Sequence, residues 1–234
     1  MAKLFAGALL ALLLAGCESQ PASVQPAAPA AEALPTSTPQ VPVAGPERRI
    51  LAFGNSLFAG YNVTPEESYP ARLQAALRAR GINAEVVNAG VSGDTTQAGR
   101  ARLAFTLDAQ EERPDLFILE LGGNDLLRGV PIEQTRANLA AMLAELRRRE
   151  IPVLLMGMRA PPNLGADYVA QFDAIYPDLA REYGAQLVPF FLQSIYDQPQ
   201  LIQQDRIHPT AQGIEALVAA TVEEVSRALP EEDA

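Results

Sequence analysis

The sequence contains one cysteine, one histidine and no tryptophan in 234 residues. These counts exclude a disulfide within the chain and any metal site that needs two histidine or two cysteine ligands. Basic residues are also scarce: 18 Lys and Arg stand against 28 Asp and Glu, giving a formal net charge of −10 and an isoelectric point of about 4.6. A field of this sign repels phosphate backbones, so no nucleic-acid partner is expected.

The composition fits a folded protein. Hydrophobic residues make up 48% of the chain and charged residues 20%, which is enough for one domain of ordinary size or two very small ones. Disorder throughout the chain and collagen-like repeats are excluded. Any chemistry that needs an imidazole has His208 as its one candidate.

The first residues have the order of a secretory signal. A lysine precedes an apolar run from Leu4 to Ala15, which Gly16 and Cys17 follow. The run is shorter than the about 20 apolar residues that a membrane-spanning helix needs. Leu14-Ala15-Gly16-Cys17 resembles the bacterial lipoprotein box, in which the cysteine is acylated and becomes the new N-terminus. We therefore predict a lipoprotein signal peptide at 1–16 and lipidation at Cys17.

The alternative is an ordinary signal peptide with an incidental cysteine.

A lipid anchor at Cys17 would hold the protein on a membrane surface without spanning it. The expected location is thus the bacterial cell envelope, facing the periplasm, and Glu18 leaves the choice between inner and outer membrane open.

A proline-rich segment separates this signal from the rest of the chain. Residues 17–46 are rich in alanine and contain seven prolines, which favour extended backbone and predict a semi-rigid tether. The folded domain is expected at 47–230, followed by an acidic tail at 231–234.

Short apolar runs alternate with segments of helical spacing in the predicted domain. Strands are predicted at 49–53, 85–88, 116–119, 153–156 and 187–188. Helices are predicted at 64–81, 98–109, around 139–146, at 168–183 and at 213–229. The connections are too long for hairpins. The expected fold class is therefore α/β, a three-layer α/β/α sandwich with a central parallel sheet.

Polar residues gather directly after the predicted strands, where sites in parallel sheets lie. Ser56 lies in a strand-to-helix turn that would present its hydroxyl, although serine is also a common helix cap. Asp205 and His208 are three residues apart, so the carboxylate can reach the imidazole, fix its tautomer and stabilise its charged form. A histidine near a helix start is also commonly a surface or capping residue.

Gly93 and Asn124 supply the two kinds of donor that can stabilise an oxyanion, a closely approachable backbone N–H and a side-chain amide. In isolation Gly93 equally fits an ordinary turn, and Asn124 an N-cap. The combined order Ser, Gly, Asn and Asp-x-x-His favours hydrolysis of an ester by a serine.

The motifs around these residues resemble the SGNH-hydrolase superfamily, also called GDSL esterases. The likeness is greatest to its bacterial branch of arylesterases, acyl-CoA thioesterase I and lysophospholipase L1 enzymes, and it covers about residues 49–229. It is carried by Gly54-Asn55-Ser56-Leu57 with Ala59-Gly60-Tyr61, Asn88 to Thr95, Glu120 to Asp125 with Leu127-Arg128-Gly129, 174–177 and 205–209.

The resemblance implies the flavodoxin-like fold of that superfamily, with Ser56 as nucleophile, His208 as general base and Asp205 as its orienting carboxylate. The backbone N–H groups of Ser56 and Gly93 and the Asn124 side chain would form the oxyanion hole. The implied reaction is a two-step acyl transfer without a metal or organic cofactor. Its substrate would be a small acyl ester, a thioester or a lysophospholipid, and the chain is expected to be a monomer.

Asn55 departs from the family motif, which reads Gly-Asp-Ser-Leu. Our hypothesis is that the amide reduces or alters activity without abolishing it, because it keeps the shape and some hydrogen bonding but removes a charge. The alternative enzyme is a carbohydrate or peptidoglycan O-acetyl esterase, and a non-catalytic envelope-binding lipoprotein is a further alternative. The loop 156–163 resembles the acyl-lining loop of the thioesterase branch, or is simply a rigid connection.

Overall fold

The structure is a computed structural model that describes residues 42–231. The predictions of a signal peptide at 1–16, of lipidation at Cys17 and of most of the tether at 17–46 lie outside the described residues. The chain divides into two units, Met1–Pro39 and Gln40–Ala234, and every element described below belongs to the second.

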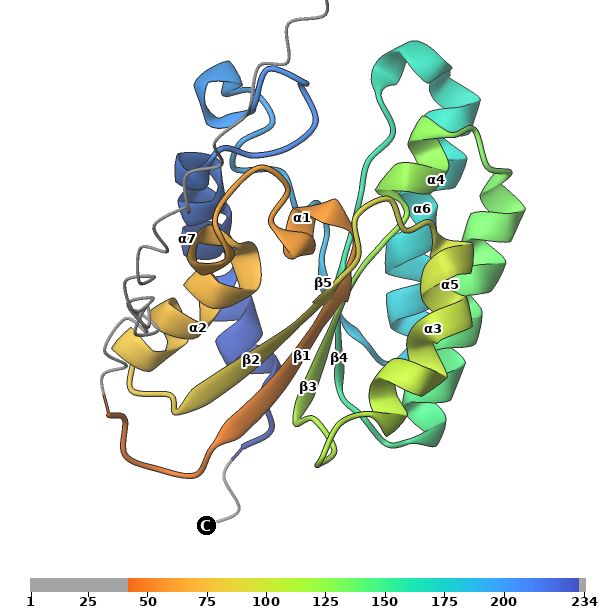
Figure 1. Ribbon diagram of the computed structural model, residues 1–234. Coiled ribbons are helices and arrows are strands. Elements are labelled where there is room, and N and C mark those ends of the chain that lie inside the picture. Colours follow the sequence, from red (N-terminus) through yellow and green to blue (C-terminus); the bar gives the residue numbers. More distant parts are fainter. Residues whose placement is uncertain (1–41, 232–234) are drawn as a thin grey trace, which may run out of the picture. The chain divides into compact units, whose positions relative to one another are not determined.

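A five-stranded parallel sheet forms the middle of this unit (Figure 1). The strand order is β2-β1-β3-β4-β5. The register places Gly54, at the end of β1, level with Gly90 on β2 and with Glu120 on β3. The strands are β1 (Arg48–Gly54), β2 (Ala84–Gly90), β3 (Leu116–Glu120), β4 (Val153–Met156) and β5 (Gln186–Val188).

Helices cover both faces of the sheet (Figure 1). On one face α2 and α7 pack against each other, while α3, α5 and α6 form the layer on the other face. The predicted three-layer α/β/α sandwich with a parallel sheet is confirmed. The helices are α2 (Tyr69–Ala79), α3 (Thr96–Asp108), α5 (Ile132–Arg148), α6 (Ala166–Tyr183) and α7 (Ala211–Ala228).

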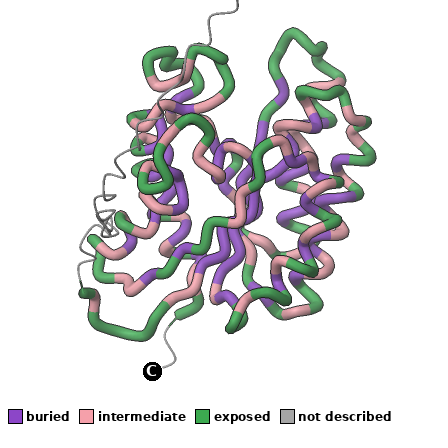
Figure 2. The backbone as a smooth tube through the Cα atoms, in the orientation of Figure 1, coloured by how far each residue is buried: buried purple, intermediate pink, exposed green. Residues whose placement is uncertain are grey.

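The core lies between the sheet and the two helix layers, where Figure 2 shows the buried segments. All residues of β3 are buried, as expected of a central parallel strand with helices on both faces. On α5, Leu139, Met142, Leu143 and Leu146 are buried at helical spacing. Burial of each such side chain contributes about 1.5–3 kcal/mol, so this stripe holds α5 in its layer.

Two short helices stand at the carboxyl end of the sheet and carry motif residues. Helix α1 (Ser56–Ala59) follows β1, and helix α4 (Gly123–Leu127) follows β3. The sequence pattern predicts neither, because segments of this length are too short to show a hydrophobic period.

The segment from Thr64 differs from the predicted helix start. The Glu67 carboxylate does accept the Thr64 N–H at 3.1 Å, as a capping box requires, but residues 65–67 form a separate 3-10 turn, η1 (Pro65–Glu67). Helix α2 begins at Tyr69. A continuous helix would drive the Pro70 ring into the carbonyl of the residue four positions earlier, so Pro70 is tolerated only in a first turn.

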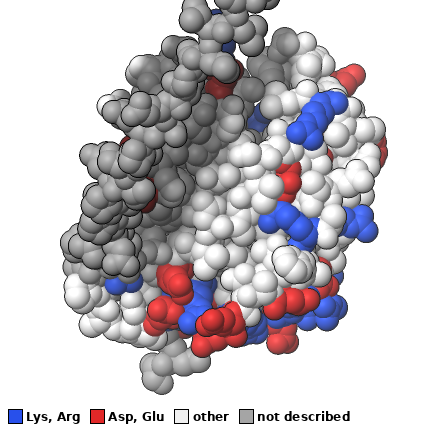
Figure 3. Space-filling model, viewed as in Figure 1, with Lys and Arg blue, Asp and Glu red and all other residues white. Residues whose placement is uncertain are grey.

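Acidic and basic side chains gather along the lower edge of the face shown in Figure 3. Ion pairs lie at the amino-terminal end of the sheet, where Arg149 pairs with Asp108 at 2.6 Å and with Glu145 at 2.7 Å. Exposed pairs of this kind contribute at most about 1 kcal/mol. Within residues 42–231, none of the helices has both the length and the apolar character needed to cross a membrane.

Candidate active site

The loops that follow β1, β2 and β3 meet at one end of the sheet. The chain passes from β1 to β2 on one side and then crosses to β3 on the other, so the strand order reverses at β1, where sites in such sheets form. The Val91 N–H donates to the Gly54 carbonyl at 3.0 Å, and the Asn88 amide donates to the Phe58 carbonyl at 2.9 Å. These bonds tie the loop after β2 to the turn that carries Ser56.

Three of the predicted residues form a continuous hydrogen-bonded chain. Ser56 Oγ lies 2.8 Å from His208 Nε2, and His208 Nδ1 lies 2.7 Å from Asp205 Oδ2. A carboxylate facing Nδ1 favours the tautomer that carries its proton there. His208 then presents an unprotonated Nε2 to the serine hydroxyl, which is the arrangement that a general base needs.

Asp205 is held as an anion by its own turn. Its Oδ1 accepts the backbone N–H of Ile207 at 2.9 Å and that of His208 at 3.0 Å. Burial by itself would raise the pKa of Asp205, but the hydrogen bonds from the His208 ring and from these two N–H groups outweigh it and lower that pKa. Arg206, with φ of +61°, makes the turn. A left-handed non-glycine residue costs about 1–2 kcal/mol.

Ser56 is the first residue of α1 and does not cap it. Asn55 is the N-cap, because its Oδ1 accepts the Leu57 N–H at 2.9 Å. The alternative that Ser56 serves as a helix cap is therefore wrong. Its hydroxyl instead faces His208.

Asp94, the residue that follows Gly93, links Gly93 to Asn124. Asn124 Nδ2 donates to the Asp94 carbonyl at 2.9 Å, and Arg128 Nη2 donates to the Gly93 carbonyl at 2.8 Å. Gly93 has φ of +86°, which glycine adopts without steric cost. The alternative of Asn124 as an N-cap is wrong, because Gly122 is the N-cap of α4 and Asn124 lies inside that helix.

An ion pair fixes the same loop from the side of α3. Arg102 Nε lies 2.6 Å from Asp94 Oδ2, and Arg102 Nη2 donates to the Gly54 carbonyl at 3.0 Å. The side chains of Arg102 and Asp94 are 21% and 11% exposed, so their attraction is screened less than that of a surface pair. One guanidinium therefore holds the end of β1 and the loop after β2 together.

Gly122 lies where α6 approaches the turn after β3. It has φ of +112°, and a Cβ at this position would clash with the Tyr176 hydroxyl. That hydroxyl donates to the Leu121 carbonyl at 3.0 Å. Burial, with Glu120 and Asp125 nearby, raises the pKa of Tyr176 well above its ordinary value, so the phenol stays neutral.

Helix α4 is anchored by a buried carboxylate. Asp125 is 1% exposed and accepts the backbone N–H of Thr96 at 2.8 Å and the Thr96 hydroxyl. The Thr135 hydroxyl donates to it from α5 at 3.3 Å. Asn124 is therefore mounted on a helix fixed to both α3 and α5.

Tyr61 and Arg128 contact the candidate residues, and the sequence pattern predicts neither contact. The Tyr61 ring lies 4.3 Å from the His208 ring, centroid to centroid, and covers one face of it. Arg128 donates to the Gly93 carbonyl. Both residues belong to the stretches that carry the family resemblance, but no spacing rule tells which strand-end loop they contact.

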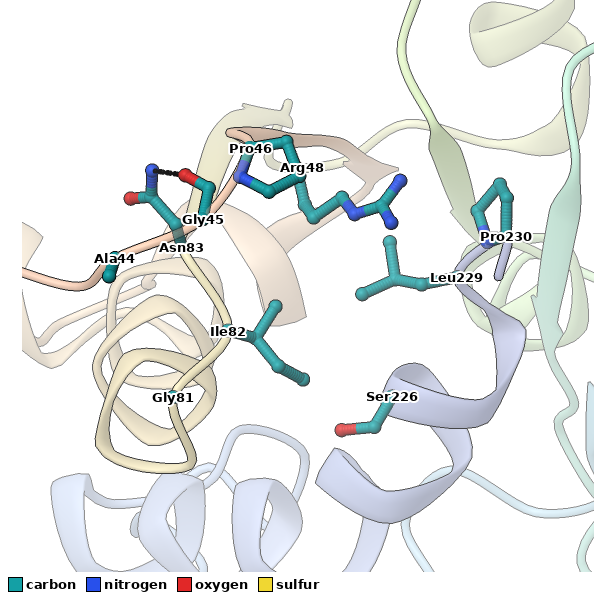
Figure 4. A pocket seen from close by; sticks show the side chains of 10 residues that line it. All are labelled: Ala44, Gly45, Pro46, Arg48, Gly81, Ile82, Asn83, Ser226, Leu229 and Pro230. Carbon is teal, nitrogen blue, oxygen red and sulfur yellow. Dashed lines mark hydrogen bonds between the residues drawn. The ribbon is translucent and has the colours of Figure 1, made fainter. Parts of the chain in front are cut away.

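Among the clefts lined by described residues, one adjoins this site and another lies far from it. A hollow of about 610 Å³ adjoins Asp205 and is lined also by Tyr61, Asn62 and Gln203. A smaller cleft of about 160 Å³ lies at the other end of β1 (Figure 4). There the Asn83 amide donates to the Gly45 carbonyl at 3.1 Å, and Arg48 is the charged residue of the lining. Among the described residues, the lining of the smaller cleft includes no carboxylate and no imidazole.

Among residues 42–231 there is no group of three or more His, Cys, Asp or Glu side chains placed to hold a metal ion.

Sequence comparison identifies the family. A profile of the GDSL-like Lipase/Acylhydrolase family matches residues 52–216. The chain belongs to this family. The predicted membership of the SGNH or GDSL hydrolases is thereby confirmed.

Several proteins similar to this chain are named enzymes. An arylesterase of Vibrio mimicus is 41% identical over 161 residues, which cover 69% of this chain and 80% of the arylesterase. Thioesterase 1/protease 1/lysophospholipase L1 of Escherichia coli (strain K12) is 41% identical over 160 residues, covering 68% of this chain and 74% of that enzyme. The crystal structure of AlinE4, an SGNH-hydrolase family esterase, has 61% sequence identity and a TM-score of 0.68, and covers 80% of this chain and 100% of its own.

This GDSL family member is an ester hydrolase, and the prediction of that enzyme class is confirmed.

Proposed function

We propose that the protein hydrolyses carboxylic esters or thioesters with Ser56 as nucleophile, His208 as general base and Asp205 as the orienting carboxylate. The observation that carries this proposal is the hydrogen-bonded chain from Ser56 Oγ through both ring nitrogens of His208 to Asp205. It supplies a nucleophile, a base in the correct tautomer and a group that stabilises the imidazolium, in the geometry that acyl transfer needs.

In the first step Ser56 Oγ attacks the substrate carbonyl carbon while its proton passes to His208 Nε2. The tetrahedral intermediate collapses when the bond to the leaving group breaks and His208 returns the proton to that group. Water then attacks the acyl-serine, giving its proton to His208, and the carboxylic acid leaves as Ser56 regains a proton. Asp205 remains ionised throughout and stabilises the charged ring.

The oxyanion of this intermediate would be bound by the backbone N–H groups of Ser56 and Gly93 and by Asn124 Nδ2. Contacts within the protein fix the surroundings of two of these donors. The Asp94 carbonyl orients the Asn124 amide, and Arg128 binds the Gly93 carbonyl, which belongs to the peptide that follows the Gly93 N–H. Donors fixed before the reaction need no reorganisation when the negative charge develops.

The surroundings of Ser56 favour an apolar acyl or aryl group. Exposed apolar side chains lie on the segments that carry the candidate residues, at Tyr61, Val91 and Ile207 and at Leu127, the last residue of α4. The loop 156–163 adjoins α4, since a Cβ placed on Gly123 would lie 3.0 Å from Met158 Cε. We therefore favour an arylesterase, acyl-CoA thioesterase or lysophospholipase type of substrate.

A carbohydrate or peptidoglycan O-acetyl esterase is the second candidate. The hollow beside Asp205 favours it, because Asn62, Gln203 and Gln204 line that hollow with amides. Amide groups suit the hydroxyls of a sugar, whose polar surface an apolar groove would reject.

The experiment that separates these functions is hydrolysis of a p-nitrophenyl ester series from acetyl to palmitoyl, with acetylated xylan and peptidoglycan fragments alongside. The purified protein is compared with Ser56→Ala and His208→Ala. Activity on the nitrophenyl esters that both variants lose supports the first candidate, and the optimal chain length tells a short-acyl esterase from a lipid-directed enzyme. Release of acetate from the glycans alone supports the second. No hydrolysis of any of them leaves the envelope-binding lipoprotein as the better account.

We also propose that Cys17 carries the lipid that places the enzyme on the envelope membrane as a monomer facing the periplasm. The support is the apolar run from Leu4 to Ala15 ahead of Gly16 and Cys17. Incorporation of labelled palmitate into the protein but not into Cys17→Ser, with recovery of the label in the membrane fraction, tests this proposal.

A further inference from the structure

A buried donor–acceptor pair lies directly behind the Ser56 turn. Glu120, the last residue of β3, is fully buried, and Asn55 is 2% exposed. Glu120 Oε2 accepts the Asn55 backbone N–H at 3.3 Å, and Glu120 Oε1 accepts the Asn55 side-chain amide at 3.0 Å. Both oxygens of the carboxylate therefore face donors of a single residue.

The other end of the Asn55 amide faces the nucleophile. Its Oδ1 accepts the Leu57 N–H at 2.9 Å and lies 3.4 Å from Ser56 Oγ. In the flipped orientation of the amide, its NH₂ group would face the Leu57 N–H and its oxygen would face the carboxylate, so neither hydrogen bond could form. The carboxylate thus fixes the orientation of the amide, and the amide fixes the first turn of α1.

We propose that Asn55 and Glu120 are a matched amide–carboxylate pair that positions Ser56 and keeps it in place at alkaline pH without a shared proton. The inference rests on the proposed role of Ser56 as the nucleophile. It concerns positioning residues, because neither side chain takes part in the acyl transfer itself.

An aspartate at position 55 would place a second carboxyl group against Glu120. Two carboxyl groups at hydrogen-bond distance in a dry site must hold one proton between them, because two buried like charges at that distance repel strongly. An amide supplies the donor permanently. Burial raises the pKa of Glu120 to about 7 even with both hydrogen bonds from Asn55 lowering it, so above about pH 7 the amide faces a carboxylate.

None of the variants replaces the other ionisable groups around the pair. Tyr176 faces Glu120 from α6 and is neutral. Arg102 on α3 reaches the Gly54 carbonyl beside the pair, and its charge is paired with Asp94. On the far side of Ser56 lies His208.

The first test is the pH dependence of kcat for Asn55→Asp beside the unaltered protein, both as full chains. The two carboxyl groups of Asn55→Asp share a proton at neutral pH and lose it as the pH rises. We expect its kcat to fall by about tenfold or more between about pH 7 and about pH 9.5, because repulsion between the two anions displaces Ser56. The unaltered protein should show no such fall. Asn83→Asp, which adds a carboxylate at a half-buried position at the far end of the sheet, is the control.

The second test exchanges the two groups. In Glu120→Gln alone, the new NH₂ group faces a hydrogen-bond donor of Asn55 and cannot accept from it. This variant should therefore have a lower kcat at every pH. The double variant Asn55→Asp with Glu120→Gln again holds one carboxylate and one amide. We expect it to regain an alkaline profile like that of the unaltered protein and most of the kcat lost in each single variant. A purely steric role for these side chains predicts no such rescue.

Three outcomes are distinguishable. An alkaline profile of Asn55→Asp that matches the unaltered protein, or a double variant no better than the single ones, overturns the inference. If Asn55→Asp unfolds at alkaline pH, the double variant decides, since recovered folding and activity support the pair and their absence refutes it. Hydrolysis that survives Ser56→Ala contradicts the proposed function but not the pairing. Urea unfolding of the unaltered protein, the two single variants and the double variant across the same pH range still tests the pairing.

Discussion

His208 Nε2 lies 2.8 Å from Ser56 Oγ although 152 residues separate the two in the chain. Ser56 follows strand β1, and His208 precedes α7, which packs on the same face of the sheet as α2. The whole α/β unit must therefore close before the nucleophile meets its base. A change that loosens either end of this contact should reduce turnover more than it reduces binding.

Replacement of Asp205 by asparagine should lower kcat by about 10³- to 10⁴-fold with little change in KM. The amide no longer selects the tautomer with the proton on Nδ1 and no longer stabilises the imidazolium. Steady-state kinetics on a p-nitrophenyl ester measure the effect, with the exposed Asp197→Asn as control. A loss of less than tenfold would argue that His208 is not oriented through Asp205.

Replacement of Asn124 by alanine should lower kcat by about 10²- to 10³-fold, as loss of one oxyanion donor does. The variant removes both the Nδ2 donor and its bond to the Asp94 carbonyl. Asn83→Ala, at the far end of the sheet, should leave kcat unchanged. A change confined to KM would place Asn124 in ground-state binding of the substrate instead.

Gly122→Ala should destabilise the fold by about 3 kcal/mol or more, because it combines a strained φ with a clash against the Tyr176 hydroxyl. Gly165→Ala is the matched control. Gly165 has φ of +92°, and a Cβ added there would meet no atom within 4 Å, so its alanine variant should lose only the cost of the strained backbone, about 1–3 kcal/mol. Urea unfolding measures both. Equal losses would show that the contact with Tyr176 contributes nothing.

Glu120 should make stability fall as the pH rises from about 4.5 to above 7. Its pKa in the folded state is about 7, against 4.5 for the free side chain, so folding favours the protonated form and its contribution is lost as the buried carboxyl ionises. The shift corresponds to a loss on the order of 3 kcal/mol relative to Glu120→Gln across that range. Unfolding free energies of both proteins at each pH test this, and parallel curves would contradict it.

The large elements could be predicted because their burial follows a regular period. The all-apolar run of β3 and the leucine stripe of α5 each match one template, and the structure has them where the sequence predicts them. The helix start at Thr64 is wrong because the capping box is a local signal, whereas Pro70, six residues later, decides where the helix can begin.

The candidate site divides in the same way. Asp205 and His208 are three residues apart, so their contact follows from the sequence, and Ser56 follows from its place after a strand. The contact of Tyr61 with His208, the bond of Arg128 to Gly93 and the pairing of Asn55 with Glu120 all join separate loops or strands. Such contacts depend on the order of the strands and on how the loops pack, which local residue spacing does not fix.

The most direct test of the account is covalent labelling of the purified protein with a fluorophosphonate, read by intact mass and by peptide mapping. The account predicts a single phosphonyl adduct on Ser56, which His208→Ala slows by orders of magnitude and Ser56→Ala abolishes. An adduct on another residue, or no adduct in a folded protein that still cleaves esters, would contradict the claim that Ser56 is the nucleophile.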